Sequence, residues 1–220
     1  KPICGSAKEA QQIRSALGRN PKQFLSSNLI LRYYPRFQML RDWMKKDRFG
    51  RIYLMEGAYD YGRIEKLLSG WRGDVKDYSV VLGGGVHLID LILWLKGVRV
   101  SEVSAFGNNF MTQGSKFQSN DCVVAILRFE DNTIAKITSN FGCVHPHFHE
   151  LNFFGERGSG NHRLGGWEIF ESRDPNTPPQ NITCPYPGVE KGRMLLDFIN
   201  RIDGKPYGDL ALVDQIFDSF

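Results

Sequence analysis

The segment from Gly83 to Leu95 constrains the fold more than any other part of this sequence. It opens with three glycines, and the residues that follow are apolar on nearly every side of a helix, which is typical of a helix buried in a protein core. Its only polar side chains before Lys96 are His87 and Asp90, and their spacing of three residues places both on one face. The sequence therefore predicts a glycine-opened, buried helix that carries an imidazole and a carboxylate.

The burial of His87 and Asp90 has two interpretations. An imidazole and a carboxylate cost free energy to bury unless they have partners, so backbone groups of the core could satisfy the pair. Alternatively, the glycines let a ligand approach the helix start closely. His87 would then lie in the first turn, where the helix dipole disfavours an imidazolium, and a neutral imidazole can accept a proton near neutral pH. Both interpretations fit the pattern.

The composition is that of an ordinary soluble protein. The chain has 220 residues with 41% hydrophobic and 24% charged residues, enough to bury a core without metals or disulfides. Its net charge of +4 is spread along the sequence, so we expect no nucleic-acid partner, although an anionic ligand would suit it. Its four cysteines form no CxxC pair, and no signal peptide or membrane span is recognisable. We therefore expect a cytoplasmic protein with no membrane partner.

The first part of the chain predicts helices and two strands. Ser6 is placed to cap a helix to about Leu17, and Pro35 is placed to begin a helix to about Lys46. Apolar and aromatic residues predict strands, and turn residues predict their ends. On this basis we expect strands over 24–34 and 51–61, a short helix over 63–68 and a turn over 71–74.

The second part of the chain reads mainly as strands. They are expected over 98–107, 121–129, 133–141, 148–154 and 167–170, followed by a loop over 172–187 and helices over 189–202 and from 210 onward. Short turns between successive strands predict antiparallel pairing. The expected fold class is α+β, an open, mostly antiparallel sheet with helices packed on one face, in a single domain over 1–220.

Cysteine and histidine alternate from Cys143 to His149. In an extended strand, the side chains of Cys143, His145, His147 and His149 would share one face. A row along one strand does not surround a metal ion tetrahedrally, and Pro146 disrupts strand pairing. We therefore expect no metal site in this segment.

Short motifs in a specific order point to one family. They are Lys1-Pro2, Asn28–Phe37, Gly50–Ile52, Trp71-Arg72, Gly84–Asp90, Phe129–Thr133 and Phe154–Ser159. In order and spacing they resemble the Gfo/Idh/MocA family of NAD(P)-dependent oxidoreductases, which includes glucose–fructose oxidoreductase and inositol dehydrogenase. The resemblance covers essentially the whole chain, but only the second half of a typical member.

The resemblance implies a particular part of a two-domain enzyme. Family members bind NAD or NADP with an N-terminal Rossmann domain. Their C-terminal domain resembles that of glyceraldehyde-3-phosphate dehydrogenase, and its open sheet faces the substrate and often forms a homo-oligomer interface. We find no Gly-x-Gly-x-x-Gly between a strand and a helix, because Gly155–Gly160 has the wrong spacing. We therefore expect a substrate-binding and oligomerisation domain truncated at both ends and inactive alone.

The resemblance also assigns roles to individual residues. Lys1 and His87 match the catalytic lysine and histidine, which handle the proton of the reacting hydroxyl, and Lys1 also lies near the nicotinamide in relatives. Arg32 matches a position that contacts substrate, with a salt bridge at a strand end as the structural alternative. Many members have an Asp four residues before the histidine, where this chain has Gly83.

Further candidates for substrate binding surround these residues. Arg72 could reach the pocket or be a turn residue, and Asp90 could bind substrate or satisfy arginine and backbone donors. His147 lies in a segment that matches a family strand beside the active site. Tyr59 and Tyr61 alternate onto one sheet face, where they either line the cleft or pack in the core.

Two functions follow from this resemblance. In the first, the full enzyme transfers a hydride between a nicotinamide and a hydroxyl-bearing carbon of a sugar, sugar derivative or cyclitol. In the second, the chain is a non-catalytic ligand-binding or dimerisation module of the same fold, which the glycine at position 83 motivates.

Overall fold

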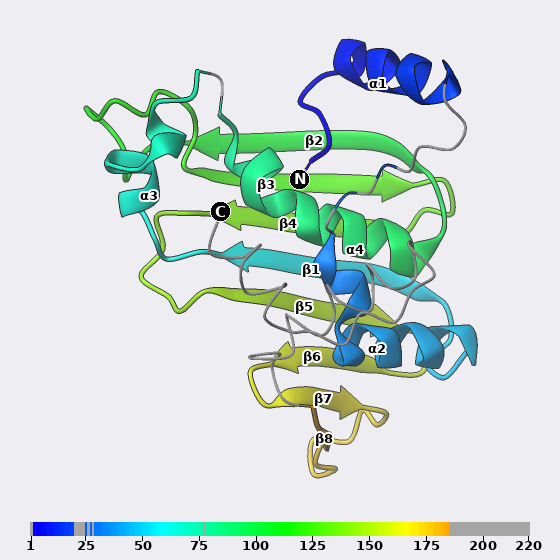
Figure 1. Ribbon diagram of the computed structural model, residues 1–220. Coiled ribbons are helices and arrows are strands. Elements are labelled where there is room, and N and C mark those ends of the chain that lie inside the picture. The colour runs from blue at the N-terminus through cyan, green and yellow to red at the C-terminus, as the bar shows by residue number, and fades with distance from the viewer. Residues whose placement is uncertain (1, 20–24, 26, 28, 77, 185–220) are drawn as a thin grey trace, which may run out of the picture.

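One open sheet of eight strands organises the computed structural model, which describes residues 2–19, 25, 27, 29–76 and 78–184 (Figure 1). The strand order is β2-β3-β4-β1-β5-β6-β7-β8. All neighbouring strands are antiparallel except β1 and β4, which are parallel. The strands are β1 (Ile52–Asp60), β2 (Val100–Asn108), β3 (Cys122–Phe129), β4 (Ile134–Asn140), β5 (Phe148–Gly155), β6 (Ser159–Arg163), β7 (Gly166–Phe170) and β8 (Gln180–Thr183).

Helices cover one face of this sheet. In Figure 1, α2 and α4 lie in front of the central strands, and α4 contacts β1 and β4. The helices are α1 (Ala7–Arg19), α2 (Pro35–Lys45), α3 (Glu65–Leu68) and α4 (Val86–Lys96), with the 3-10 turns η1 (Ile30–Tyr33) and η2 (Trp71–Gly73) and the π-helical turn η3 (Val81–Gly85). The expected α+β fold, an open and mostly antiparallel sheet with helices on one face, is confirmed.

A glycine in the central strand brings α4 close to the sheet. A Cβ atom at Gly57 would lie 3.4 Å from Leu88 and 3.5 Å from Ile92, so these side chains already fill the space above β1. Leu88 and Ile92 are completely buried, as is Met55 two residues earlier on the same face of the strand. The apolar residues of α4 thus form the centre of the core, as the sequence pattern predicts.

The opposite face of the sheet carries a mixture of charged and apolar side chains. Lys136 and Glu56 lie side by side on neighbouring strands and form an ion pair of 2.7 Å. Ile126 pairs with Lys136 across the next strand and is 41% exposed, and Phe106 on β2 is 83% exposed. In the described part of the chain, this face is therefore open.

Capping groups lie at the start of α1 and at the end of α4. The Ser6 hydroxyl accepts a hydrogen bond of 3.2 Å from the backbone N–H of Glu9, whose carboxylate in turn accepts one of 2.7 Å from the Gly5 N–H, so both free N–H groups are satisfied. Gly97 ends α4 with a φ of 66°, a conformation that glycine adopts without strain. The helix from Ser6 runs to Arg19, slightly beyond the expected Leu17.

The expected strand over 24–34 is wrong in its described part. Residues Ile30–Tyr33 form η1 instead, because Leu31 and Tyr34 are buried against the helical layer and η1 packs on α4 and α2. Pro35 then begins α2 directly, as expected. The apolar and aromatic side chains that indicated a strand here pack into the core from a 3-10 turn.

Other expectations concern the last part of the chain. The expected loop over 172–187 contains β8 (Gln180–Thr183), and β6 (Ser159–Arg163) lies in a stretch without an expected strand. Both strands are short and largely polar, and their pairing with β7 holds them in the sheet. The expected helices over 189–202 and from 210 onward lie outside the described residues.

Candidate functional site

Aromatic and imidazole rings gather where β1 ends, and we call this group the ring cluster. The rings of Tyr59 and His87 are stacked at an angle of 17°, with their centroids 6.2 Å apart. His149 on β5 lies 5.0 Å from Tyr59 and 5.6 Å from His87, and His147 lies 4.9 Å from His149. The full ring cluster consists of Tyr59, Tyr61, His87, Phe141, His147 and His149.

The glycines before His87 allow this close packing. A Cβ atom at Gly84 would overlap the Tyr59 ring and lie 2.8 Å from Phe141, and one at Gly85 would overlap the Ser139 hydroxyl. The space beside these glycines is therefore filled by the protein's own side chains, from β1, from β4 and from Phe141 just after β4.

His87 is deeply placed in this group, with only 3% of its surface exposed. His87 is the second residue of α4, but the helical segment begins earlier, at Val80, and passes through η3 before α4. Because the helix dipole acts mainly within the first turn, the environment of the imidazole is set by the rings around it. Burial raises the pKa of Tyr59, with smaller effects from Tyr61 and Tyr78, which keeps this phenol protonated.

Arg32 and Asp90 form a two-pronged ion pair that joins η1 to α4. Arg32 Nε donates to Asp90 Oδ2 at 2.7 Å, and its Nη2 donates to Oδ1. The Asp90 side chain is only 11% exposed, whereas that of Arg32 is 41% exposed. The hydrogen bond to Asp90 raises the pKa of Arg32. In this structure Asp90 therefore accepts hydrogen bonds from an arginine, as in the interpretation that gives it a structural role.

A second guanidinium meets a phenol beside η3. Arg72 Nε donates to the Tyr78 hydroxyl at 3.2 Å, and the guanidinium carbon lies 4.7 Å from the Trp71 ring centroid. A Cβ atom at Gly83 would overlap this hydroxyl. Sequence reasoning did not single out Tyr78, although a glycine inside a helical segment is a signal of close approach by another group.

One expected site residue lies outside the described residues, and one histidine of the segment from Cys143 to His149 lies apart from the ring cluster. Lys1 lies outside the described residues. His145 is exposed, and its Nδ1 lies 2.7 Å from the Pro146 carbonyl oxygen, so it does not join His147 in the ring cluster. In the described ranges, no three His, Cys, Asp or Glu side chains are arranged to hold a metal ion.

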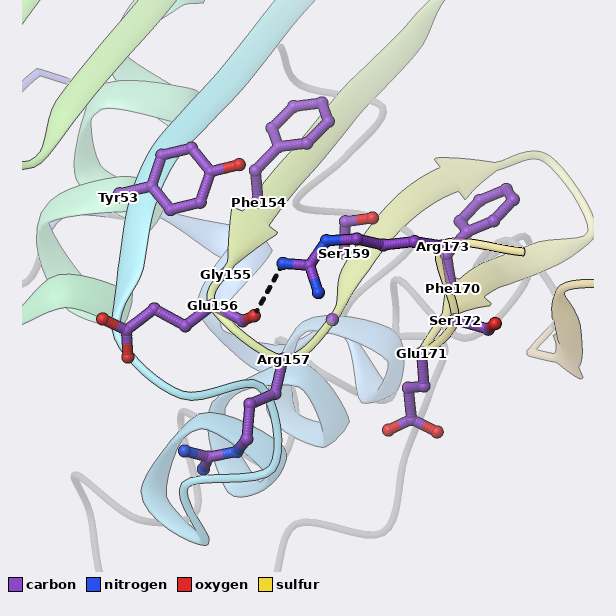
Figure 2. Close-up of a pocket in the computed structure, with 11 residues that line it drawn as sticks. Tyr53, Phe154, Gly155, Glu156, Arg157, Ser159, Phe170, Glu171, Ser172 and Arg173 are labelled. Carbon is purple, nitrogen blue, oxygen red and sulfur yellow. Dashed lines mark hydrogen bonds between the residues drawn. The ribbon is translucent and has the colours of Figure 1, made fainter. Parts of the chain in front are cut away.

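A separate cavity of about 160 Å³ lies at the other end of β1, beside Tyr53 (Figure 2). Carboxylates in its wall are paired: Glu156 with Arg51 at 3.1 Å, and Glu171 with Arg48 at 2.7 Å. These pairs hold the turns around the cavity. Its lining residues are Tyr53, Phe154, Gly155, Glu156, Arg157, Gly158, Ser159, Phe170, Glu171, Ser172 and Arg173.

None of the described helices has both the length and the apolar character needed to cross a membrane. The helices are instead short elements packed against or beside the sheet.

Comparisons with solved structures identify the same fold. An oxidoreductase domain protein from Kribbella flavida has 18% identity and a TM-score of 0.77, over 97% of this chain and 67% of that one. A myo-inositol 2-dehydrogenase from Lactobacillus plantarum has 18% identity and a TM-score of 0.68, over 99% and 62%. An inositol dehydrogenase homolog from Azotobacter vinelandii, solved with NADH and myo-inositol, has 16% identity and a TM-score of 0.70, over 83% and 48%.

The chain spans about half to two-thirds of the length of these solved proteins. A search of the curated proteins finds no match. Residues 37–160, more than half of the 220 residues, match the GFO/IDH/MocA C-terminal domain. This range contains all six residues of the ring cluster. The expected family is confirmed, and the chain belongs to the GFO/IDH/MocA family of oxidoreductases, as a C-terminal domain.

Proposed function

We propose that this chain is the substrate-binding domain of an NAD(P)-dependent oxidoreductase that acts on a sugar, sugar derivative or cyclitol. The observation that carries the proposal is the position of His87 against Tyr59 and His149, in a domain of this oxidoreductase family. The Azotobacter relative solved with NADH and myo-inositol supports a nicotinamide cofactor and a polyol substrate.

The described residues do not form a cradle for a dinucleotide. The glycines of Gly155–Gly160 join β5 to β6 in a hairpin, whereas dinucleotide binding needs a strand–turn–helix unit. We therefore assign cofactor binding to a Rossmann domain outside this chain, with Lys1 as the contribution of the chain itself. When bound, the cofactor accepts or supplies the hydride.

The role of this chain is to hold the substrate and move a proton. His87 takes the proton of the substrate hydroxyl while the carbon that bears it loses a hydride, and the product is a carbonyl. The stacked Tyr59 ring fixes the plane of the imidazole. Lys1 polarises the reacting oxygen. Arg32, Arg72, Asp90 and His147 are the substrate-binding residues of this proposal.

In this proposal, the open face of the sheet is the interface of a homo-oligomer. We assign the protein to the cytoplasm, without nucleic-acid or membrane partners. A second function, a non-catalytic ligand-binding or dimerisation module, is favoured by two observations: His87 is only 3% exposed, and position 83 is a glycine.

Turnover measurements separate these functions. The chain joined to its Rossmann domain is assayed for reduction of NAD⁺ and NADP⁺ with myo-inositol and sugars. We expect His87→Asn to lower kcat by about 100-fold or more, because general acid–base catalysis contributes about 10²–10⁴-fold.

The matched control is His145→Asn, which removes an exposed imidazole outside the ring cluster. We expect normal turnover from this control and none from the chain without its Rossmann domain. Undiminished turnover in His87→Asn would exclude His87 as the base. A two-domain protein that binds polyols but no nicotinamide would support the non-catalytic module.

A further inference from the structure

A phenolic hydroxyl occupies the place of a side chain on the helix that carries His87. The Tyr78 hydroxyl lies where a Cβ atom of Gly83 would be, four residues before His87. Residues four apart are neighbours on a helix face, and η3 and α4 form one continuous helical segment. The hydroxyl therefore lies along the helix from the imidazole, on the side of the ring cluster.

Two arginines bring positive charge to this place. Arg72 donates to the Tyr78 hydroxyl at 3.2 Å. The Arg63 guanidinium carbon lies 5.3 Å from the Tyr61 ring centroid, and the Tyr61 and Tyr59 rings are stacked 5.6 Å apart. Both guanidiniums lower the pKa of Tyr59, against the larger effect of burial, so both act on the same part of the ring cluster.

The two guanidiniums can only donate hydrogen bonds. Within the described ranges, neither Arg63 nor Arg72 has a carboxylate within ion-pair distance, whereas Arg32 and Arg51 are paired with Asp90 and Glu156. The Tyr78 oxygen already accepts from Arg72, so its own proton is left to donate. No acceptor for that proton lies within hydrogen-bond distance among the described residues.

We propose that the substrate carries an anionic oxygen group, a carboxylate or a phosphate, which Arg72 and Tyr78 bind while Arg63 supplies further positive charge. Anionic oxygens offer several acceptor sites and no competing donor, and their hydrogen bonds to guanidinium are stronger than those of neutral groups. This inference rests on the proposed function and narrows its substrate class to acidic or phosphorylated sugars and polyols.

Binding calorimetry on the two-domain protein tests the inference without turnover. The probes are D-glucuronate, D-glucose 6-phosphate and neutral D-glucose, which share one ring and differ in charge. We expect at least one anionic probe to bind about tenfold or more tightly than glucose, and Arg72→Gln to remove that difference, because a charge-assisted hydrogen bond carries about a tenfold effect or more. The anionic probe that binds more tightly identifies the anionic group of the substrate as a carboxylate or a phosphate.

Tyr78→Phe is the more conservative variant. It keeps the ring contacts with Trp71 and Phe117 and removes only the hydroxyl. We expect it to weaken binding of the anionic probe about tenfold, the effect of one hydrogen bond to a charged group, with no change in the binding of glucose. Thermal unfolding of each variant shows whether it remains folded at the temperature of the titration.

Arg51→Gln is the matched control, because it removes the same charge at the other end of β1, where Arg51 pairs with Glu156. Equal binding of glucose and the anions, or equal losses in Arg51→Gln and Arg72→Gln, would overturn the inference. Anion binding in a protein that transfers no hydride would leave the inference intact and refute the proposed reaction. If the protein turned over neutral polyols and Arg72→Gln left that turnover unchanged, the proposed reaction would stand and the inference would be refuted.

Discussion

Single glycines decide how closely the helix backbone approaches the sheet. A Cβ atom at Gly84 would overlap the Tyr59 ring and lie 2.8 Å from Phe141. Alanine favours a helix over glycine by about 1 kcal/mol, but overpacking a core costs about 1–3 kcal/mol. Because both rings are buried, we expect the clash to dominate. Gly84→Ala should lower the free energy of unfolding in urea by about 1–2 kcal/mol.

The control for this prediction is Gly18→Ala in α1. No heavy atom lies within 4 Å of a Cβ atom at that position, so the same substitution meets open space. We expect it to leave the free energy of unfolding unchanged or slightly higher. If Gly84→Ala were as stable as the unaltered chain, the close packing of Tyr59 on the helix would be refuted.

His162 makes the stability of the fold depend on pH. Its Nδ1–H donates to the His149 carbonyl at 2.9 Å, and its Nε2 accepts from the buried Arg36 at 2.5 Å. Burial, with the positive charge of Arg36, lowers the pKa of His162 to about 3. An unfolded histidine has a pKa of about 6.5. Between these values the unfolded chain holds a proton that the folded chain lacks.

The free energy of unfolding should therefore fall as the pH decreases below about 6.5, by up to about 1.4 kcal/mol per pH unit from this residue. Urea unfolding between pH 7.5 and 4.5 measures this slope. His162→Gln should flatten the slope by that amount, whatever it does to the stability at pH 7.5. His145→Gln, at an exposed position, should leave the slope unchanged.

At the scale of elements, the ion pair of Arg32 and Asp90 fixes η1 on α4. A double-mutant cycle with Arg32→Ala and Asp90→Ala should give a coupling free energy of about 1 kcal/mol. The expected value is modest because Arg32 is 41% exposed, so water screens the pair. Urea unfolding of the four proteins measures it, and a coupling near zero would show that the pair does not hold η1.

The elements show what a sequence can predict and what it cannot. The strands from Cys122 to Gly155 were predictable because they are rich in apolar residues and turn residues separate them. The strand β6 has the sequence SGNHR and lacks that pattern. It is held in the sheet by its pairing with β5 on one side and β7 on the other. The parallel pairing of β1 with β4 joins segments far apart in the chain, which no local pattern encodes.

The site was predictable to the same extent. The glycines and the apolar helix identify His87 as a buried polar residue. The ring stacked on it comes from β1, far away in the sequence, and the hydroxyl of Tyr78 reaches Gly83 through the conformation of the few residues between them. Such contacts depend on the packed fold, so the sequence pattern shows that space is needed at Gly83 but not which group fills it.

For the whole molecule, we propose that the sheet face left open by the described residues is a contact between two copies of the chain. Apolar side chains on neighbouring strands lie around the central ion pair of Glu56 and Lys136. They include Phe106, Val124, Ile126 and Ile134, with exposed fractions of 83%, 36%, 41% and 41%. A second copy would bury this apolar surface, and in an antiparallel face-to-face contact each ion pair could meet its equivalent.

Ile126→Lys tests this arrangement, since Ile126 lies directly beside Lys136. A second ammonium at the centre of the contact repels Lys136 and is costly to bury, so we expect the dimer dissociation constant to rise by at least about tenfold. Sedimentation velocity over a concentration series measures it. Val144→Lys, at a fully exposed loop position, adds the same charge away from the face and should leave the dimer intact. A chain that sediments as a monomer throughout, or a dimer that both variants preserve, would place the contact elsewhere.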